Sequence, residues 1–95
     1  MSEAKLQTKM IKRLEKENWY VRKVIAANRK GTPDIIACCD GQFVAIEVKL
    51  PGNKASALQE ENISRIQEAG GKAVVLDSME GLEGFIQGIK NVYTI

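Results

Sequence analysis

The sequence contains no histidine, and this absence excludes several kinds of enzyme chemistry. Without an imidazole, Ser-His-Asp and Cys-His catalysis are impossible, and nearly every zinc site lacks a usual ligand. The two cysteines, Cys38 and Cys39, are adjacent. In a strand their side chains point to opposite faces, so an ordinary disulfide between them is not expected. If the protein is an enzyme, its tools are expected to be carboxylates, lysines and a hard metal ion.

Long apolar runs are also missing from the sequence. No segment approaches the length that spans a bilayer, and the first residues, MSEAKLQTK, lack the apolar stretch of a signal peptide. We therefore expect an intracellular (cytoplasmic) protein with no membrane partner. A chain of 95 residues can bury one core, which predicts a single domain over residues 1–95.

Positive charge is concentrated in the first part of the chain. The first 54 residues carry 11 Lys and Arg against 6 Asp and Glu, whereas the remaining residues carry 3 against 6. A basic half on a small domain is typical of proteins that bind polyanions. Taken alone, however, the charge distribution favours an ordinary solvated surface.

Hydrophobic periodicity predicts an α/β fold with the order αβββαβα and a mixed sheet flanked by helices. The expected helices cover residues 3–16 and 56–69 and a last segment that begins near residues 77–80. The expected strands cover residues 19–27, 34–39, 42–49 and 72–77.

Turn and cap signals connect these elements. Asp40-Gly41 is a two-residue hairpin signal, which makes the second and third strands antiparallel. The segment from Ser56 to Gln59 has the form of a capping box, and Gly70-Gly71 ends the helix that it opens. The strands before and after that helix are expected to be parallel, because a helical crossover joins them.

One constellation of polar residues is predicted to carry chemistry. Glu47 and Lys49 lie two residues apart on one strand and so share a face. The hairpin returns Asp34, which follows Pro33, to the level of Glu47. The alternative is that Glu-x-Lys is a surface pair and Pro-Asp an ordinary turn. The combination with the Gly-x-Pro-Asp lead-in favours a functional cluster.

Two carboxylates and a lysine suit metal-assisted phosphodiester hydrolysis. Asp34 and Glu47 would bind Mg²⁺ or Mn²⁺ through hard oxygens, and the backbone carbonyl of Val48 is a further candidate ligand. The metal would activate water and stabilise charge on the phosphate. Lys49 would orient or deprotonate that water, or neutralise the phosphate.

The residues GTPD at Gly31–Asp34 and IEVK at Ile46–Lys49 resemble the signature of the PD-(D/E)xK nuclease superfamily. Within it, the chain is most similar to the stand-alone VRR-NUC domains of phages and bacteria, over nearly its whole length. This resemblance implies a restriction-endonuclease-like αβββαβ core plus a C-terminal helix. It also implies an endodeoxyribonuclease that depends on Mg²⁺ or Mn²⁺. Archaeal-type Holliday junction resolvases share the same layout.

The resemblance adds two site residues. Glu3 matches a family glutamate that completes the metal site, and Gln59 matches a glutamine that lines the active site. Gln7 lies one turn beyond Glu3 on the same helix face. Apart from the resemblance, Glu3 would be a solubilising surface residue. The catalytic role of Gln59 competes with its role in the capping box.

Basic side chains near the constellation are candidates for phosphate contacts, which position DNA without reading its sequence. These candidates are Arg22, Lys23, Arg29, Lys30 and Lys54. A chain this short has no room for a separate DNA-reading domain, so the expected substrate is branched DNA, with the four-way Holliday junction favoured.

A homodimer is expected to place two cleavage centres on such a junction, with the last helix and the tail 91–95 as apolar surface for the dimer. Two alternatives stay open: a monomeric flap or nicking nuclease, and a non-catalytic nucleic-acid-binding module on the same fold.

Overall fold

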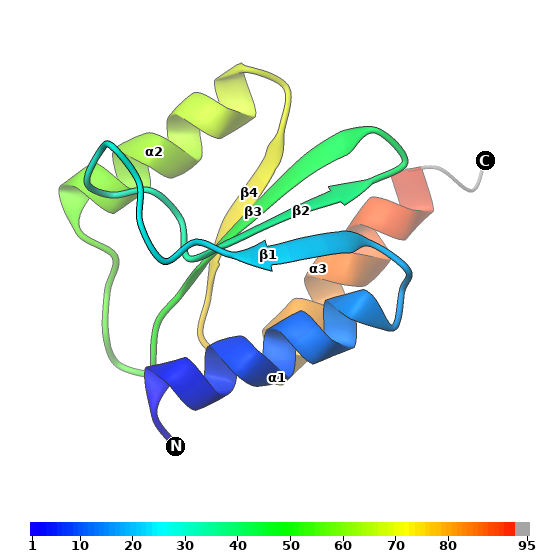
Figure 1. The fold of residues 1–95 in the computed structure, drawn as a ribbon, viewed down its shortest axis with the longest axis horizontal. Helices are drawn as coiled ribbons and strands as arrows, with labels where there is room; N and C mark the ends of the chain where they lie inside the picture. Colours follow the sequence, from blue (N-terminus) through cyan, green and yellow to red (C-terminus); the bar gives the residue numbers. More distant parts are fainter. Residues whose placement is uncertain (93–95) are drawn as a thin grey trace.

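The structure is a computed structural model that describes residues 1–92. It contains three helices and four strands in the predicted order (Figure 1). In chain order, the elements are α1 (Glu3–Glu15), β1 (Tyr20–Lys23), β2 (Ile35–Cys39), β3 (Gln42–Val48), α2 (Ala57–Glu68), β4 (Lys72–Leu76) and α3 (Met79–Val92).

The four strands form one mixed sheet in the order β1-β2-β3-β4. The first three strands are antiparallel neighbours, and β4 pairs with β3 in parallel. The predicted hairpin is confirmed: Cys39 pairs with Gln42, and both Asp40 and Gly41 have positive φ, at 49° and 79°. A type I′ turn requires positive φ at both positions, which an Asp-Gly pair adopts at low cost.

Local capping explains where the helices begin and end. The Ser2 hydroxyl accepts a hydrogen bond from the backbone N–H of Lys5 at the start of α1, and Asn18, with a φ of 65°, follows its end. The predicted capping box of α2 is confirmed, because both of its reciprocal hydrogen bonds are present. Ser78 caps α3 by accepting a hydrogen bond from the backbone N–H of Gly81. These caps satisfy backbone donors that no carbonyl within the helix can reach.

The prediction of a long first strand over residues 19–27 is wrong, because β1 ends at Lys23. Lys23 pairs with Ile35 in the register, and the N–H of Val24 donates one more hydrogen bond to the carbonyl of Asp34. The β-branched residues beyond this point have no strand to pair with, because β2 begins only at Ile35 and Pro33 has no N–H to donate. Ile25 is accordingly exposed.

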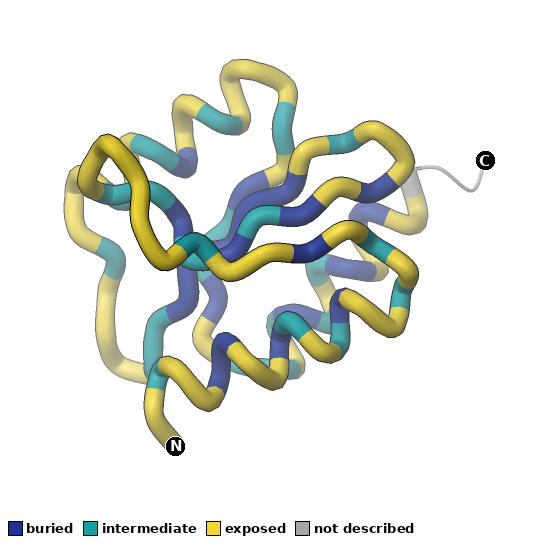
Figure 2. The backbone as a smooth tube through the Cα atoms, in the orientation of Figure 1, coloured by how far each residue is buried: buried dark blue, intermediate teal, exposed yellow. Residues whose placement is uncertain are grey.

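The two faces of the sheet are covered differently. Figure 1 shows α1 and α3 on one side of the sheet and α2 on the other. The larger core lies between the sheet and the helices α1 and α3. Figure 2 shows buried positions on the strands and on these two helices. The large core contains Met10, Leu14, Ile35, Ile46, Leu82 and Ile86, each fully buried.

The core under α2 is small, and its members are Ala45, Ile63 and Ala73 with Ile66 and Val75 beside them. Alternation along the strands therefore divides the residues of β3 between the two faces. Val44, Ile46 and Val48 belong to the large core. Phe43, Ala45 and Glu47 point toward the α2 side.

Ion pairs join the C-terminal end of α1 and the turn after it to α3. Arg13 donates to Glu83 with a 2.6 Å Nε–Oε2 separation, and it also pairs with Glu17. Lys90 pairs with Glu17 at 2.7 Å. These partners raise the pKa of Arg13 and lower that of Glu17. Among residues 1–92, no helix is both long and apolar enough to cross a membrane.

The tail 91–95, which we expected to provide apolar surface for a dimer, lies outside the described residues from position 93 onward.

Substitution of two leucines tests the assignment of the large core. Leu14 is fully buried, whereas Leu58 at the start of α2 is 44% exposed. We expect Leu14→Ala to lower the free energy of unfolding by about 3 kcal/mol, because it leaves a cavity in the large core. The same change at Leu58 should cost less than about 1 kcal/mol. Urea denaturation of both variants measures the difference, and equal losses would contradict the assigned core.

Candidate active site

Asp34 and Glu47 lie next to each other because of the β2–β3 register. Ile35 pairs with Ile46, so Asp34, one residue before β2, is level with Glu47 near the end of β3. One oxygen of Asp34, Oδ2, accepts a hydrogen bond of 2.9 Å from the backbone N–H of Val48. The predicted proximity of the two carboxylates is therefore present, and Pro33, which precedes Asp34, is buried.

Glu47 is buried, and its carboxylate is only partly satisfied. The side chain is 2% exposed. Its Oε2 accepts a hydrogen bond of 3.3 Å from Nε2 of Gln59, and it lies 3.8 Å from the ammonium of Lys49. Its Oε1 is buried and has no hydrogen-bond partner. An unpartnered buried carboxylate oxygen is costly, because folding removes it from water without compensation.

Burial and a like charge both disfavour the ionised form of Glu47. The pKa of Glu47 rises from 4.5 to about 8, first because burial penalises the charge. The next causes are the carboxyl group of Asp34, which is within hydrogen-bonding reach, and the negative charge of Asp34. The charge of Lys49 opposes this rise in pKa. Two adjacent carboxylates can share a hydrogen bond only if one of them holds a proton, so the pair needs either a proton or a cation.

Gln59 connects the helix cap to the site. Its Oε1 accepts a 2.8 Å hydrogen bond from the backbone N–H of Ser56, which is half of the capping box. Its Nε2 donates to Glu47 at the same time. The two roles that competed in the sequence are therefore compatible, because each uses a different atom of the same amide. The cap orients the amide so that its donor faces the carboxylate.

Glu3 approaches the site from the other side of the sheet. It is the first residue of α1 and is half-buried, and its charge contributes to the raised pKa of Glu47. Gln7, one turn further, is buried at 7% exposure. Across residues 1–92, however, no three Asp, Glu, Cys or His side chains lie close enough together to hold a metal ion. Asp34 and Glu47 are brought together, and Glu3 acts on Glu47 through its charge.

The pair nevertheless fits a divalent cation. Hard cations prefer carboxylate and carbonyl oxygens, and the buried Oε1 of Glu47 lacks any partner that a cation would displace. A cation would also remove the repulsion between Asp34 and Glu47 that burial strengthens. The orphaned oxygen and the second carboxylate beside it therefore form a pair of ligands that suits a divalent cation.

The predicted phosphate-binding residues fall into two groups, of which only the second lines a cavity beside α2. Lys23 and Lys54 are exposed, and the guanidinium of Arg22 lies 4.1 Å from the ring centroid of Tyr20. Arg29 and Lys30 line a cavity of about 270 Å³ between their loop and α2.

Asn62 and Arg65 of α2 line the other side of this cavity, and they were not among the residues predicted from the sequence. They lie one and two turns beyond Leu58, and the spacing 58-62-65 is the signal that could have identified them.

Gly31 explains why the basic loop lies so close to α2. It has a φ of 83°, which favours glycine. A Cβ at this position would lie 2.8 Å from Nδ2 of Asn62 and 2.9 Å from Cγ of Leu58. A side chain at this position would therefore clash with α2 unless the loop or these neighbouring side chains moved.

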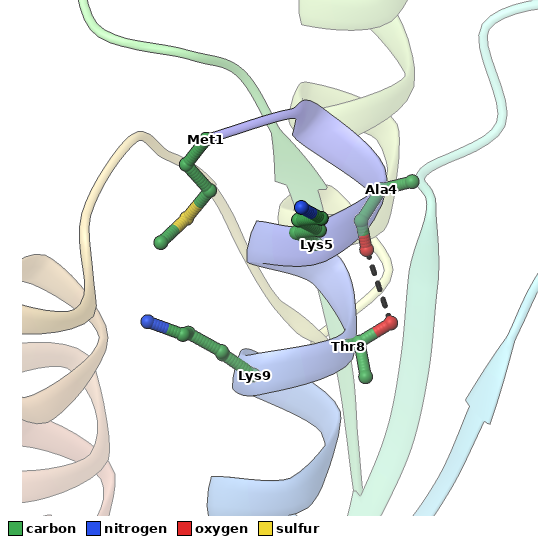
Figure 3. Close-up of a pocket in the computed structure, with 5 residues that line it drawn as sticks. All are labelled: Met1, Ala4, Lys5, Thr8 and Lys9. Carbon is green, nitrogen blue, oxygen red and sulfur yellow. Dashed lines mark hydrogen bonds between the residues drawn. The ribbon is translucent and has the colours of Figure 1, made fainter.

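A second cavity, of about 550 Å³, lies on the outer face of α1 (Figure 3). Its lining residues are Met1, Ala4, Lys5, Thr8 and Lys9. None of these is a carboxylate, and the only hydrogen bond drawn among them joins Thr8 to the carbonyl of Ala4. This cavity is therefore separate from the Asp34–Glu47 pair.

Comparison with known proteins gives one family. The sequence model of the VRR-NUC domain matches residues 2–80. A protein of Acyrthosiphon pisum secondary endosymbiont phage 1, named "Putative nuclease p44", is 27% identical over 79 residues, which are 82% of this chain and 85% of the phage protein.

Two solved structures share the fold. One, titled as a VRR_NUC domain, has a TM-score of 0.79 at 25% identity and covers 90% of this chain and 94% of its own. The other, titled as a VRR_NUC domain protein, has a TM-score of 0.76 at 23% identity and covers 92% of this chain and 86% of its own.

The raised pKa of Glu47 predicts how stability depends on pH in the absence of metal. The folded state holds a proton on Glu47 up to about pH 8, whereas the unfolded chain releases it near 4.5. Between these values the folded state binds more protons, so the free energy of unfolding must fall as pH rises. Each unit between the two pKa values corresponds to about 1.4 kcal/mol.

Urea denaturation in EDTA at about pH 5, 7 and 9 measures this loss, with the window taken from the linkage relation. Glu47→Gln, which cannot ionise, should show a flatter profile. Equal slopes in the native chain and the variant would show that Glu47 titrates normally.

Proposed function

This chain belongs to the VRR-NUC domain family of nucleases, and from that premise we propose that Asp34, Glu47 and Lys49 form the active site of an endonuclease that depends on Mg²⁺ or Mn²⁺ and cleaves branched DNA. One observation carries the proposal: a fully buried glutamate lies beside a second carboxylate and keeps one oxygen without a partner. Such an arrangement lowers the stability of the fold, and a bound cation would offset this loss.

Each residue has a defined place in this proposal. Asp34, Glu47 and the backbone carbonyl of Val48 would hold the metal ion, with Glu3 adding negative charge nearby. The ion would supply Lewis acidity to the phosphodiester and to the water that attacks it. Gln59 orients the carboxylate of Glu47 through its 3.3 Å hydrogen bond.

Lys49 completes the proposed site. Its ammonium lies 3.8 Å from Oε2 of Glu47, and the side chain is 17% exposed. It is therefore held at the edge of the buried pair with access to solvent. From there it would position or deprotonate the attacking water, or neutralise charge on the phosphate.

A homodimer acting on four-way junctions is the preferred form of the proposal. Paired incision of a junction needs two sites related by a two-fold axis, which a homodimer provides. Arg29 and Lys30 would contact phosphates beside each site, and Arg22, Lys23 and Lys54 would add to the attraction. A monomeric flap or nicking nuclease and a non-catalytic binding module are the alternatives.

Cleavage of labelled DNA of several shapes tests the proposed function. A four-way junction, a flap, a duplex and a single strand would each be incubated with Mg²⁺, Mn²⁺ or EDTA. We expect metal-dependent, symmetric incision of the junction. Cleavage of flaps alone would retain the nuclease and favour the monomer. A folded chain that cuts nothing with either metal would support the binding module instead.

Lys49→Ala tests the division of labour within the site. We expect cleavage to fall at least about a hundredfold, the usual contribution of a positioned proton-transfer group. Binding of Mn²⁺ and DNA should be largely retained, because both carboxylates remain. The matched control is Lys72→Ala, an exposed lysine that pairs with Val44 at the other end of β3. Full activity in Lys49→Ala would refute the assignment.

Gln59 variants separate the cap from the site. Gln59→Ala removes both hydrogen bonds, and we expect it to lower stability by about 1 kcal/mol and to reduce cleavage. Gln59→Glu keeps an oxygen for the N–H of Ser56, so stability in the presence of metal should recover. Cleavage should not recover, because the donor to Glu47 is lost. Denaturation and cleavage assays on the two variants measure both effects, and wild-type cleavage in Gln59→Ala would make Gln59 a cap only.

A further inference from the structure

Part of the sheet surface on the α2 side remains uncovered. Helix α2 packs mainly on β4 and β3. Because Ala45 and Ala73 are its main contacts in the sheet, the helix lies close to these two strands. On β1 and β2 the positions that face the α2 side are exposed or half-buried. The one buried position of β1, which lies at the front of Figure 2, is Val21, and it faces the large core.

The uncovered surface presents a row of side chains across three strands. Tyr20 pairs with Cys38, and Cys38 pairs with Phe43, so the three side chains share one face of the sheet. Tyr20 is 58% exposed and Phe43 is 44% exposed. The guanidinium of Arg22 stacks over the Tyr20 ring at 4.1 Å. We call the surface of Tyr20, Arg22, Cys38 and Phe43 the aromatic face.

The aromatic face is continuous with the active site. Arg22 pairs with Ile36 in the register, and Asp34 lies two residues before Ile36 on the same side of β2. Glu47 lies on this side as well, four residues after Phe43. Ala45, between them on β3, is covered by α2, so the open path runs along β2: a chain laid from the hairpin end past Cys38 and Ile36 would reach Asp34 beside Glu47.

Positive charge borders the same path along α2. The cavity beside Arg29 and Lys30 adjoins one of about 300 Å³ that is lined by Phe43 and Ile66, and the two cavities share Asn62 and Arg65. These two adjacent cavities, which we call the groove, lie along α2 between the basic loop and the Phe43 ring. Two acidic residues lie nearby: Glu61, which pairs with Arg65 at 3.2 Å, and Asp40 at the hairpin tip.

We propose that the aromatic face binds an unpaired segment of DNA and leads it to Asp34 and Glu47. Exposed rings and guanidinium planes stack on bases whose faces are free, and basic side chains along a groove contact the phosphates. A duplex fits this surface poorly, because its bases are already stacked on one another. The inference rests on the proposed nuclease function and narrows its substrate to branched DNA with an unpaired segment next to the bond that is cut, which a flap contains and a fully paired four-way junction does not.

Binding of labelled DNA in EDTA tests the proposal without requiring cleavage. The probes are a single strand of about 12 nucleotides, a range typical of such surfaces, and a duplex of the same sequence, both followed by fluorescence anisotropy. We expect Phe43→Leu and Tyr20→Leu each to weaken binding of the single strand roughly tenfold, because a stacking ring is lost. Phe43→Tyr and Tyr20→Phe keep the ring and should bind as the native chain does.

Matched controls identify the role of the rings. Phe43→Leu retains an apolar side chain, so a purely hydrophobic contact would survive it while stacking would not. Lys12→Ala on the exposed side of α1 removes one charge on the opposite side of the sheet, and Arg65→Ala removes one beside the groove. We expect Arg65→Ala to weaken binding of the single strand more than Lys12→Ala does. Circular dichroism confirms that each variant is folded.

Cys38 provides a second readout on the native chain. It is exposed at the centre of the aromatic face, whereas Cys39 is buried, and burial raises the pKa of the Cys39 thiol. A maleimide should therefore modify Cys38 first. We expect the single strand to slow this modification severalfold and the duplex to leave it nearly unchanged.

Three outcomes would overturn the proposal. The first is equal binding of the single strand by Phe43→Leu and Phe43→Tyr, and the second is stronger protection of Cys38 by the duplex. The third is self-association of the chain that protects Cys38 without DNA, which would make the face an interface between two copies. These binding measurements decide the proposal whether or not the chain cleaves DNA, so a failure of the nuclease function would be seen separately in the cleavage assay.

Discussion

The pairing of β2 with β3 is the constraint on which the rest of the site depends. The Asp40-Gly41 turn sets the register, and that register places Asp34 level with Glu47. A shift of one residue would move Glu47 into the large core and Val48 onto the α2 side, because side chains alternate along a strand. The hydrogen bond from the Val48 N–H to the Asp34 carboxylate then fixes the end of this pairing. Helix caps, the basic loop and the α2 packing add to a geometry that the hairpin has already established.

The site lowers stability, and the surrounding fold compensates for this. A glutamate that is 2% exposed lies beside another carboxylate, with one oxygen unpartnered. Neutral hydrophobic residues would pack there at lower free energy. The large core under α1 and α3, with six fully buried side chains named above, tolerates this cost. The small core under α2 has another effect: it leaves β1 and the β2–β3 hairpin open on the side where the carboxylates lie.

The order of the elements was predictable, because hydrophobic periods, the Asp-Gly turn and the capping box all report on local structure. The closeness of Asp34 and Glu47 followed from the hairpin register alone. The length of β1 was not predictable, because Trp19 to Ala27 has strand composition throughout and only the absence of a pairing partner beyond Ile35 ends the strand. The two roles of Gln59 depend on which atom of its amide faces Glu47, and the close approach of Gly31 to α2 depends on tertiary packing. A sequence does not contain that information in a local pattern.

The central claim is that Asp34 and Glu47 hold a metal ion. Its most direct test is a calorimetric titration of the native chain and of Glu47→Gln with Mn²⁺, in the absence of DNA. If the buried pair is a metal site, the native chain will bind the ion saturably and its melting temperature will rise with the Mn²⁺ concentration, because the ion binds the folded state. Glu47→Gln will show much weaker binding and little change in melting temperature. Equal binding by both proteins, or none by the folded native chain, would show that Asp34 and Glu47 do not hold a metal ion.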